Sequence, residues 1–292
     1  MENSLIYLVL ALGGLCFGSF AGALVWRMRA RQLVQNKTNH EQYNKDEYHL
    51  LKKLTHARLI NDRSRCLHCD YQLRWYDLIP LLSWLSLGGK CRNCRKNIGY
   101  FEPIIEFALM LFFVLSYAFW PYELTNNLEL VRFIIWNISG ICLAILASYD
   151  AKWFLLPDRV NYLLIGLGLS SSVFAVFGSV DIVGKIGSIV GSVVILSGVY
   201  LILFLMSKGK WIGFGDIKLG LGLALLLADW QLAFVALFAA NMIGTLLVIP
   251  AMVIGKIKRS QHVPFGPLLI TGAVIAQIAG YNLIDVYMSF II

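Results

Sequence analysis

The sequence predicts an all-α, polytopic membrane protein with about eight transmembrane helices and a cytoplasmic zinc-binding loop domain between the first and second helices. Three observations predict this class. The chain is 58% hydrophobic and only 14% charged, whereas soluble domains carry about 25% charged residues. Apolar runs long enough to cross a bilayer recur along its 292 residues. Four cysteines lie close together in the long polar segment after the first apolar run.

Eight apolar runs are predicted to span the membrane. They cover residues 4–26, 103–120, 129–149, 160–177, 183–206, 217–228, 231–254 and 264–290. The first run is too long for the core of a signal peptide and no basic residue precedes it, so we expect no cleavage there. The sixth run, IKLGLGLALLLA, is short, and it can span only by sharing its hydrophobic length with the glycine-rich segment before it.

The basic residues predict the orientation of the chain. With the N-terminus outside, 23 of the 25 Lys and Arg residues fall in the inner loops, which are 27–101, 150–159, 207–218 and 255–262. This bias fits the positive-inside rule and predicts extracytoplasmic termini and a cytoplasmic large loop. The net charge of +8 is therefore a signal of topology. Because no nucleic-acid-binding module is recognisable either, we expect no nucleic-acid partner.

The large loop, residues 27–101, is predicted to be a domain of its own, between a first helix at 1–26 and a seven-helix membrane domain at 102–292. It contains two C-x-x-C pairs, which are Cys66 with Cys69 and Cys91 with Cys94. Two such pairs can direct four thiolates at one tetrahedral zinc ion. Two disulfides are the alternative, but disulfides are uncommon in the cytoplasm. The pattern favours structural zinc, because four protein ligands leave no open position for catalysis.

Two aspartates lie where predicted spans meet the inner edge of the membrane. Asp150 ends the third span, and Asp216 opens the sixth span in GFGDIK. One such aspartate can be a solvated helix end, but two facing carboxylates share a proton and can together activate water and protonate a carbonyl. We therefore predict an aspartic protease dyad. Helix dipoles favour Asp216, at a helix N-terminus, as the anion and Asp150, at a helix C-terminus, as the acid.

Four further residues are candidates for substrate binding. Gly213 and Gly215 allow a non-helical backbone that an extended substrate could approach, although a flexible turn uses glycines too. Lys218 follows Asp216 within one turn, and it either orients the substrate, balances the dyad or is an ordinary inner-loop charge. Glu106 lies near the inner edge of the second span, where it either contacts substrate or pairs with a basic neighbour.

A set of motifs along nearly the whole chain carries a resemblance to a known family. The motifs are GSF (18–20), Arg27, DRSRC-x-x-C (62–69), YDLIPLLSWL (76–85), GKCRNC (89–94), the P-x-x-E of Pro103 and Glu106, Asp150, LPD (156–158) and GFGDIKLG (213–220). Together they resemble the type IV prepilin peptidase family of membrane aspartic proteases. The G-x-G-D motif alone would be a weak signal, but the set is specific.

The resemblance implies both an activity and a location. It implies cleavage of the basic leader of type IV pilins or pilin-like subunits, on the cytoplasmic side and after a glycine, with Asp150 and Asp216 as the catalytic pair. Many members then N-methylate the new N-terminus with S-adenosylmethionine, and Glu106 would bind that amino group or a charge of the pilin. The implied location is the bacterial inner membrane, with prepilin-like precursors and the lipid bilayer as partners.

The chain departs from the family pattern in its N-terminal half. Gly22 stands for an asparagine in the first motif, Leu67 for a proline after the first cysteine, and Glu102 for a tyrosine before the P-x-x-E proline. That half resembles the region associated with methylation. The departures therefore bear on methylation, while the protease pair is intact.

Two other classes of function compete with a peptidase. Membrane-edge carboxylates and glycine-broken helices also suit a transporter or channel, but the sequence shows no inverted repeat, and a transporter does not need the four-cysteine loop. The other alternative is a non-catalytic scaffold for pilus assembly. Replacing Asp150 or Asp216 with asparagine separates these classes, because only a peptidase would lose leader cleavage.

Overall fold

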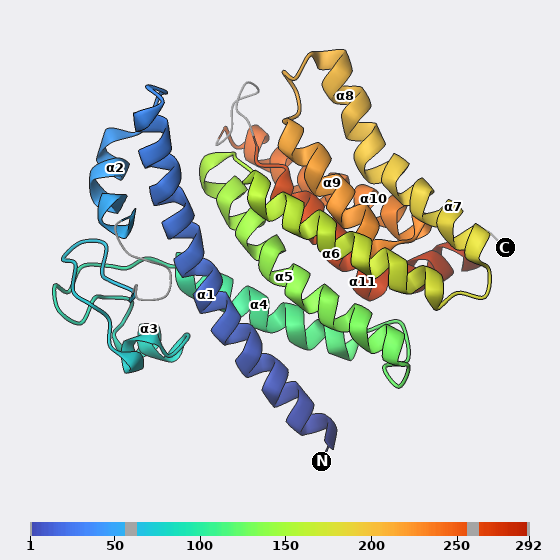
Figure 1. Ribbon diagram of the computed structural model, residues 1–292, viewed down its shortest axis with the longest axis horizontal. Helices are drawn as coiled ribbons and strands as arrows, with labels where there is room; N and C mark the ends of the chain where they lie inside the picture. The colour runs from blue at the N-terminus through green and yellow to red at the C-terminus, as the bar shows by residue number, and fades with distance from the viewer. Residues whose placement is uncertain (1, 56–62, 256–262, 291–292) are drawn as a thin grey trace. The chain divides into compact units, whose positions relative to one another are not determined.

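The structure is a computed structural model that describes residues 2–55, 63–255 and 263–290. The chain forms two compact units, Met1–Val114 and Leu115–Ile292. In the described residues the regular elements are all helices, and extended segments pair only in isolated bridges (Figure 1). The predicted all-α class is therefore confirmed.

The first unit is organised around α1 (Glu2–Thr38), which continues well beyond the predicted span at 4–26. At about 1.5 Å per residue its 37 residues extend roughly 55 Å, while a bilayer core is about 30 Å thick. The short helix α2 (Lys45–Leu51) folds back against the polar end of α1 (Figure 1). An ion pair of 2.6 Å between Arg29 and Glu47 and a small apolar cluster around Leu51 hold α2 there.

The rest of the large loop has little regular structure. Its short helical segments are η1 (Lys52–Thr55), η2 (Trp75–Leu78) and α3 (Leu82–Ser86). The loop leads into α4 (Phe101–Ala118), which begins in the first unit.

Two glycines of α1 allow α4 to approach it very closely. A Cβ atom on Gly14 would lie 2.6 Å from the Met110 Cα, and a Cβ on Gly18 would lie 2.5 Å from the Glu106 Cα. Because both obstacles are backbone atoms, no side-chain rotation could relieve the clash. The glycines are four residues apart, which is the small-xxx-small spacing of closely packed membrane helices.

We expect replacement of Gly18 with alanine to destabilise the first unit by about 1–3 kcal/mol, the usual cost of overpacking. The matched control is Gly13→Ala, because a Cβ on Gly13 meets nothing within 4 Å and alanine favours helix there. Thermal unfolding of the purified protein in detergent measures both effects. Equal melting temperatures for the two variants would contradict the close approach.

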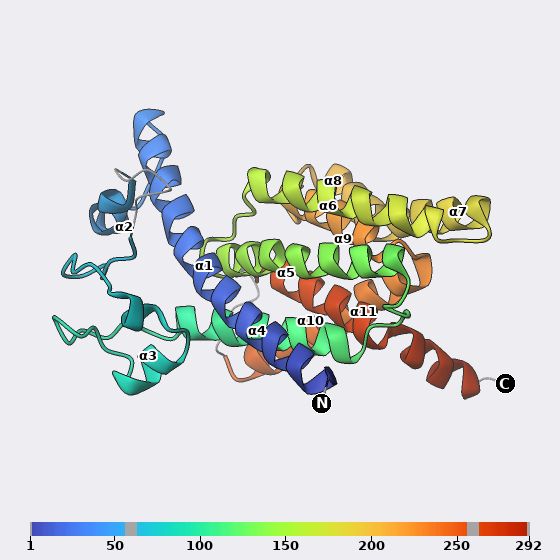
Figure 2. The ribbon, with the colours of Figure 1, turned by 60° about the horizontal axis from the view of Figure 1, so that its bottom comes forward.

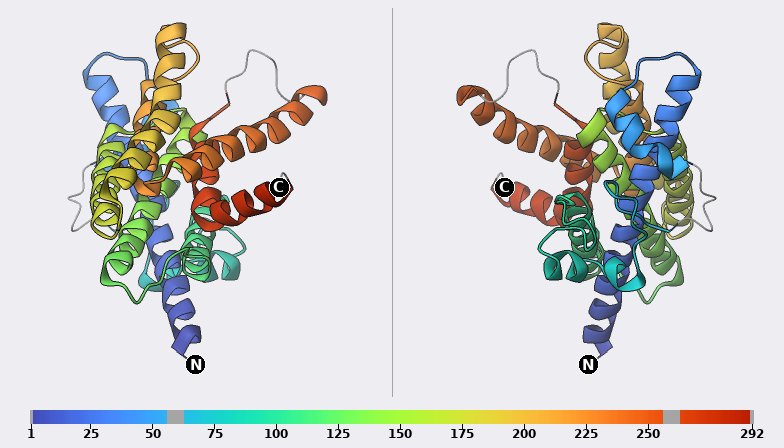
Figure 3. Two further views of the ribbon diagram at one scale, coloured as in Figure 1. Left: turned by 90° about the vertical axis from the view of Figure 1, so that its right-hand side faces the viewer. Right: turned by 90° about the vertical axis from the view of Figure 1, so that its left-hand side faces the viewer.

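The second unit is a bundle of helices. They are α5 (Asn127–Trp153), α6 (Asp158–Phe177), α7 (Ile182–Val193), α8 (Val199–Ser207), α9 (Phe214–Leu227), α10 (Trp230–Val253) and α11 (Gly266–Ser289), and a π-helical turn, Val194–Gly198, joins α7 to α8. Helices α5 and α6 run side by side (Figure 2). Helices α10 and α11 also pack together (Figure 3). Gly272 of α11 lies against the backbone of α10 there.

Helix α9 is enclosed by its neighbours in this bundle. Gly222 leaves room for Leu164 of α6, and the Ser172 hydroxyl of α6 donates to the Leu225 carbonyl at 2.6 Å. From the other side, the Ser192 hydroxyl of α7 donates to the Ala224 carbonyl at 2.9 Å. Small residues and serine hydroxyls therefore let two helices pack directly on the backbone of α9.

The structure gives seven candidate membrane spans among the described residues, by length and composition. Seven of the predicted spans correspond to them, and the exact count of eight is not confirmed. The remaining prediction, 217–228, is α9, whose 14 residues extend roughly 21 Å. This length is less than the bilayer core of about 30 Å. Enclosure by other helices accounts for its apolar sequence without lipid contact.

Arg132, one of the two basic residues outside the predicted inner loops, forms an ion pair with Glu129. Arg132 in α5 is only 4% exposed, and its guanidinium donates to both carboxylate oxygens of Glu129, at 2.8 and 3.0 Å. The ring of Tyr122 lies 5.0 Å from the same guanidinium. A buried charge that is paired in this way is compatible with a membrane helix.

Candidate functional site

Asp150 lies in the last turn of α5 and meets the start of α11. Its side chain is buried, and its Oδ2 atom accepts the Gly266 backbone N–H at 2.9 Å. A Cβ atom on Gly266 would lie 2.8 Å from the same oxygen. Only glycine therefore lets the first residue of α11 come this close to the carboxylate.

Asp216 lies in the first turn of α9 and is half-buried. Its Oδ2 atom accepts the N–H of Gly213, the N-cap residue, at 3.1 Å. A Cβ on Gly215 would lie 3.0 Å from the Leu156 Cβ, so this glycine makes room for the LPD segment. The two predicted glycines thus have different structural roles, because one binds the Asp216 carboxylate and the other admits a neighbouring side chain.

The charge of Asp150 affects the titration of Asp216. Burial raises the pKa of Asp216 to about 6, the negative charge of Asp150 adds to this rise, and the Gly213 N–H opposes it. An electrostatic effect of this kind requires the two side chains to be near neighbours. Asp150 and Asp216 are therefore close enough to interact electrostatically, although their helices are far apart in the sequence.

Helix dipoles do not distinguish the two aspartates in the structure. Asp150 belongs to the C-terminal turn of α5, but its carboxylate also receives an N–H from the first residue of α11. Asp216 receives an N–H at the start of α9. Because both carboxylates face a helix N-terminus, helix dipoles do not separate the acid from the base.

Lys218 is paired with Asp158, and among the described residues it forms no ion pair with Asp150 or Asp216. Its Nζ atom lies 2.6 Å from the Asp158 Oδ1, and it sits over the rings of Tyr162 and Phe214 at 4.9 and 5.0 Å. Asp158 is the first residue of α6. The pair therefore ties the start of α6 to the start of α9, which is the segment that holds Asp216.

Sequence reasoning did not identify two residues next to the dyad. Gly266 donates its N–H to Asp150, and Tyr200 packs its ring against Phe265 at 5.3 Å, one residue before Gly266. The Tyr200 hydroxyl is buried, and no residue that the structure describes forms a hydrogen bond with it. A signal for Gly266 was available, because P-F-G-P before the last span repeats the Phe-Gly pattern of G-F-G-D.

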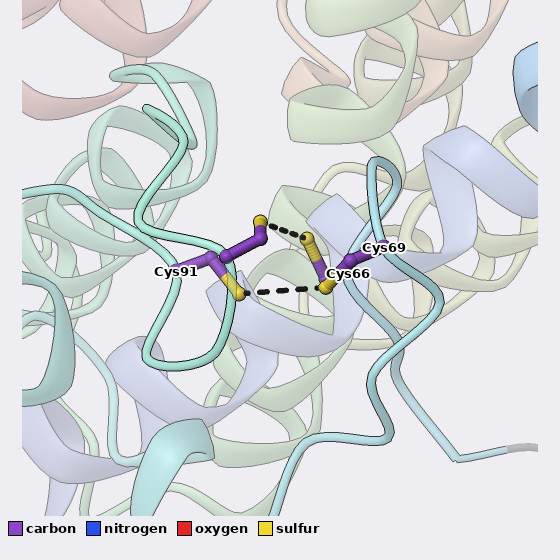
Figure 4. Close-up of side chains that lie close together, drawn as sticks. Cys66, Cys69 and Cys91 are labelled. Atoms are coloured by element: carbon purple, nitrogen blue, oxygen red, sulfur yellow. Dashed lines mark hydrogen bonds between the residues drawn. The ribbon is translucent and has the colours of Figure 1, made fainter.

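The four predicted metal-binding cysteines form one cluster in the first unit (Figure 4). The Sγ atoms of Cys66 and Cys94 lie 3.9 Å apart, as do those of Cys69 and Cys91, and all four lie within 4.8 Å of one another. Zn–S bonds of about 2.3 Å give a tetrahedron with edges of about 3.8 Å. The cysteines are free thiols rather than the alternative of two disulfides. The cluster can therefore hold a metal ion.

The two C-x-x-C pairs are closed by equivalent backbone hydrogen bonds. The N–H of Cys66 donates to the Tyr71 carbonyl, and the N–H of Cys91 donates to the Lys96 carbonyl, both at 2.9 Å. Burial raises the pKa of the Cys66 thiol to about 12, and the Tyr71 N–H lowers the pKa of Cys69 to about 6. A bound cation would hold all four groups as thiolates.

Glu106 belongs to the first unit and is 6% exposed. Its Oε2 atom accepts the N–H of Leu81 at 2.8 Å. The side chain lines a pocket of about 200 Å³ whose wall includes Trp26, Trp84 and Glu102. The predicted substrate-binding residues therefore fall into separate groups, with Gly213, Gly215 and Lys218 around α9 and Glu106 in this pocket.

Comparisons with known proteins match both halves of the chain. Residues 12–120 match the bacterial peptidase A24 N-terminal domain, and residues 137–249 match the type IV leader peptidase family. The first match includes the four cysteines and Glu106, and the second includes Asp150 and Asp216. No solved structure matches the chain.

Curated relatives extend the match along most of the chain. A prepilin leader peptidase/N-methyltransferase of Stutzerimonas stutzeri is 30% identical over 80% of this chain and 77% of its own length. One of Pseudomonas aeruginosa is 28% identical over 95% and 91%. One of Burkholderia pseudomallei is 33% identical over 72% and 65%. The resemblance seen in the motifs is confirmed, and the chain belongs to the type IV leader peptidase family.

Proposed function

We propose that the protein is an aspartic endopeptidase that cleaves the leader of type IV prepilin-like precursors after a glycine, on the cytoplasmic side of the bacterial inner membrane. The proposal is supported by two aspartates that interact electrostatically and that each accept a backbone N–H at a helix start. Membership of the leader peptidase family supports the substrate class. The distribution of basic residues supports extracytoplasmic termini and a cytoplasmic large loop.

The dyad would act through one shared proton. With one carboxyl protonated and the other ionised, the carboxylate removes a proton from water as the water oxygen attacks the carbonyl carbon of the scissile peptide. The protonated carboxyl gives its proton to the carbonyl oxygen. The tetrahedral intermediate then collapses and the C–N bond breaks. The leaving nitrogen takes up the proton that was removed from water, and the other carboxylate takes back a proton from a hydroxyl of the intermediate. The two aspartates act as a pair, so a role is assigned to neither alone.

The segment around α9 would bind the substrate backbone. Gly213 is exposed and extended, with φ −78° and ψ 151°, so a peptide could lie along it without meeting a side chain. Because Gly215 has no side chain, Leu156 can pack directly against this segment. Lys218 would serve the substrate indirectly, because its pairing with Asp158 fixes the first turn of α9 and with it the Asp216 carboxylate.

N-methylation of the new N-terminus is a second proposed activity, and the names of the relatives support it. S-adenosylmethionine would supply an electrophilic methyl group on a sulfonium sulfur. In the transfer a nitrogen–carbon bond forms, the carbon–sulfur bond breaks, the neutral thioether leaves, and the amine loses a proton. The pocket that contains Glu106 fits this chemistry, because carboxylates and tryptophan faces suit cations. Glu106 would bind the substrate amino group there.

The four-cysteine cluster would hold one structural zinc ion. We expect purified wild-type protein to contain about one zinc per chain, and Cys91→Ser to lose most of it, because a closed site needs all four thiolates. Elemental analysis measures the zinc, and thermal unfolding should show a lower melting temperature for this variant. Cys142→Ser is the matched control, since Cys142 is buried in α5 of the other unit. Zinc-free wild-type protein would contradict the assignment.

Mass spectrometry of a prepilin co-expressed with this protein tests the proposed function. We expect the pilin to lose its leader after the glycine, and a further gain of one methyl group would show methylation. Omitting the enzyme gives the background. A pilin that keeps its leader when the full-length enzyme is present in the membrane would overturn the proposal.

A further inference from the structure

A buried tyrosine of the second unit carries a hydroxyl that the dyad mechanism does not use. Tyr200 in α8 is 4% exposed, and its hydroxyl forms no hydrogen bond with any residue that the structure describes. A buried polar group without a partner destabilises a folded protein, and such exceptions are expected mainly at functional sites. The π-helical turn Val194–Gly198 directly precedes α8, and turns of this kind also occur frequently at functional sites.

Contacts between α8 and α9 place Tyr200 opposite the first turn of α9. The Ser197 hydroxyl, three residues before Tyr200, donates to the Ile217 carbonyl at 3.1 Å. The ring of Phe204, four residues after Tyr200, lies 5.8 Å from the ring of Phe214. Residues at these spacings share one side of a helix. Because Phe214 and Ile217 lie on either side of the α9 aspartate in the sequence, Tyr200 faces the turn that carries this aspartate.

Tyr200 also adjoins the residues that hold the other aspartate. Its ring lies 5.3 Å from the ring of Phe265, which immediately precedes Gly266. The Gly266 N–H binds the Asp150 carboxylate. On the α9 side, the charge of Asp216 acts on the Tyr200 hydroxyl. The tyrosine therefore contacts the support of one aspartate and lies within electrostatic range of the other.

The hydroxyl is suited to bind an oxygen of the substrate. A tyrosine hydroxyl is protonated at neutral pH and can donate one hydrogen bond. Negative charge develops on the carbonyl oxygen of the scissile peptide when water attacks, and a donor held in place for that charge lowers the barrier. Substrate entry has to open this region in any case, because Asp150 is itself only 6% exposed.

We propose that Tyr200 is a third catalytic residue, whose hydroxyl donates a hydrogen bond to the carbonyl oxygen of the scissile peptide as water attacks. The same oxygen takes its proton from the protonated carboxyl of the dyad, and its two lone pairs accommodate both donors. The phenol keeps its own proton throughout, so the proton balance of the dyad is unchanged. The inference rests on the proposed peptidase activity and adds a residue to it.

Tyr200→Phe tests the proposal, because it removes the hydroxyl and keeps the ring that packs on Phe265. We expect kcat for leader cleavage to fall more than about tenfold, toward the 10²–10³-fold that loss of one such donor costs. KM should change less than about threefold, since the hydrogen bond strengthens only in the transition state. The melting temperature should equal or exceed that of the wild type, because the hydroxyl lost was unpaired. Initial rates on a purified prepilin and thermal unfolding of the full-length enzyme in detergent measure these quantities.

Tyr281→Phe is the matched control, because this tyrosine has a hydroxyl that is already paired. The Tyr281 hydroxyl donates to the Asp229 Oδ2 at 3.2 Å and lies 3.3 Å from the Tyr122 hydroxyl. Asp229 follows the C-terminal end of α9, at the opposite end of that helix from the dyad. We expect Tyr281→Phe to lower the melting temperature and to leave kcat within about threefold of the wild type. The two variants should therefore change stability and rate in opposite patterns.

The outcomes separate this inference from the proposed function. A Tyr200→Phe enzyme whose kcat stays within about tenfold of the wild type overturns the role of Tyr200. A melting temperature below that of the wild type also overturns it, because the hydroxyl would then have a partner in the free enzyme. Asp216→Asn is measured in the same series. If it abolishes cleavage while Tyr200→Phe does not, only this inference fails, whereas a wild-type protein that does not cleave overturns the peptidase and the role of Tyr200 together.

Discussion

Replacement of either Asp150 or Asp216 with asparagine is expected to abolish leader cleavage. Loss of one general acid or base typically slows a reaction by about 10²–10⁴-fold. Asparagine keeps an oxygen that can accept the N–H of Gly266 or Gly213, so the local backbone should be preserved. Because the carboxylates act as one unit, the double variant should be no slower than the slower single variant. Initial rates on a purified prepilin in detergent measure these effects.

The Asp181→Asn variant is a control that distinguishes loss of catalysis from loss of structure. Asp181 caps α7 by accepting the Gly184 N–H at 2.9 Å, and it lies on the surface of the same unit. Asp181→Asn should therefore cleave at close to the wild-type rate. If the Asp150 or Asp216 variants also remained within about tenfold of the wild-type rate, a dyad mechanism would be wrong, and a non-catalytic scaffold or a transporter would need to be considered again.

Replacement of Gly266 with alanine should also nearly abolish cleavage, even though glycine carries no catalytic group. The new Cβ would lie 2.8 Å from the Asp150 Oδ2 and 3.3 Å from its carboxyl carbon. The carboxylate or the start of α11 must then shift by several tenths of an ångström. Displacement of a catalytic group on this scale costs up to about 10²-fold in rate. The same cleavage assay measures the loss.

The control for this variant is Gly166→Ala in α6, where a Cβ would meet nothing within 4 Å. We expect it to keep wild-type activity and to be at least as stable, because alanine favours helix over glycine. A Gly266→Ala enzyme with wild-type activity would show that Asp150 does not depend on this close contact.

The parts of the fold that the sequence predicts best are those encoded in local composition. Long apolar runs predict the seven candidate spans, because hydrocarbon excludes charge over a fixed length. The spacing of Cys66, Cys69, Cys91 and Cys94 predicts their cluster, since a C-x-x-C pair places two thiolates on one tight turn. Both signals are local and need no knowledge of distant contacts.

The parts that the sequence does not predict depend on contacts between distant segments. The 2.9 Å bond from Gly266 to Asp150 joins residues that are 116 positions apart. The pairing of Lys218 with Asp158 is similar, because neither residue indicates its partner in the sequence. Hydropathy also cannot tell an apolar helix that faces lipid from one that is enclosed by protein, which is why α9 resembled a short span.

The pH dependence of kcat/KM for leader cleavage is the most direct test of the central claim that Asp150 and Asp216 act as one dyad. This quantity reports ionisations of the free enzyme. Burial and the charge of Asp150 raise the pKa of Asp216 to about 6, so the form with one shared proton persists to higher pH than an ordinary carboxyl allows. We expect a bell-shaped profile that rises as the first carboxyl loses its proton and falls above a pKa of about 6 or higher as the second does. A profile with a single ionisation would contradict the dyad.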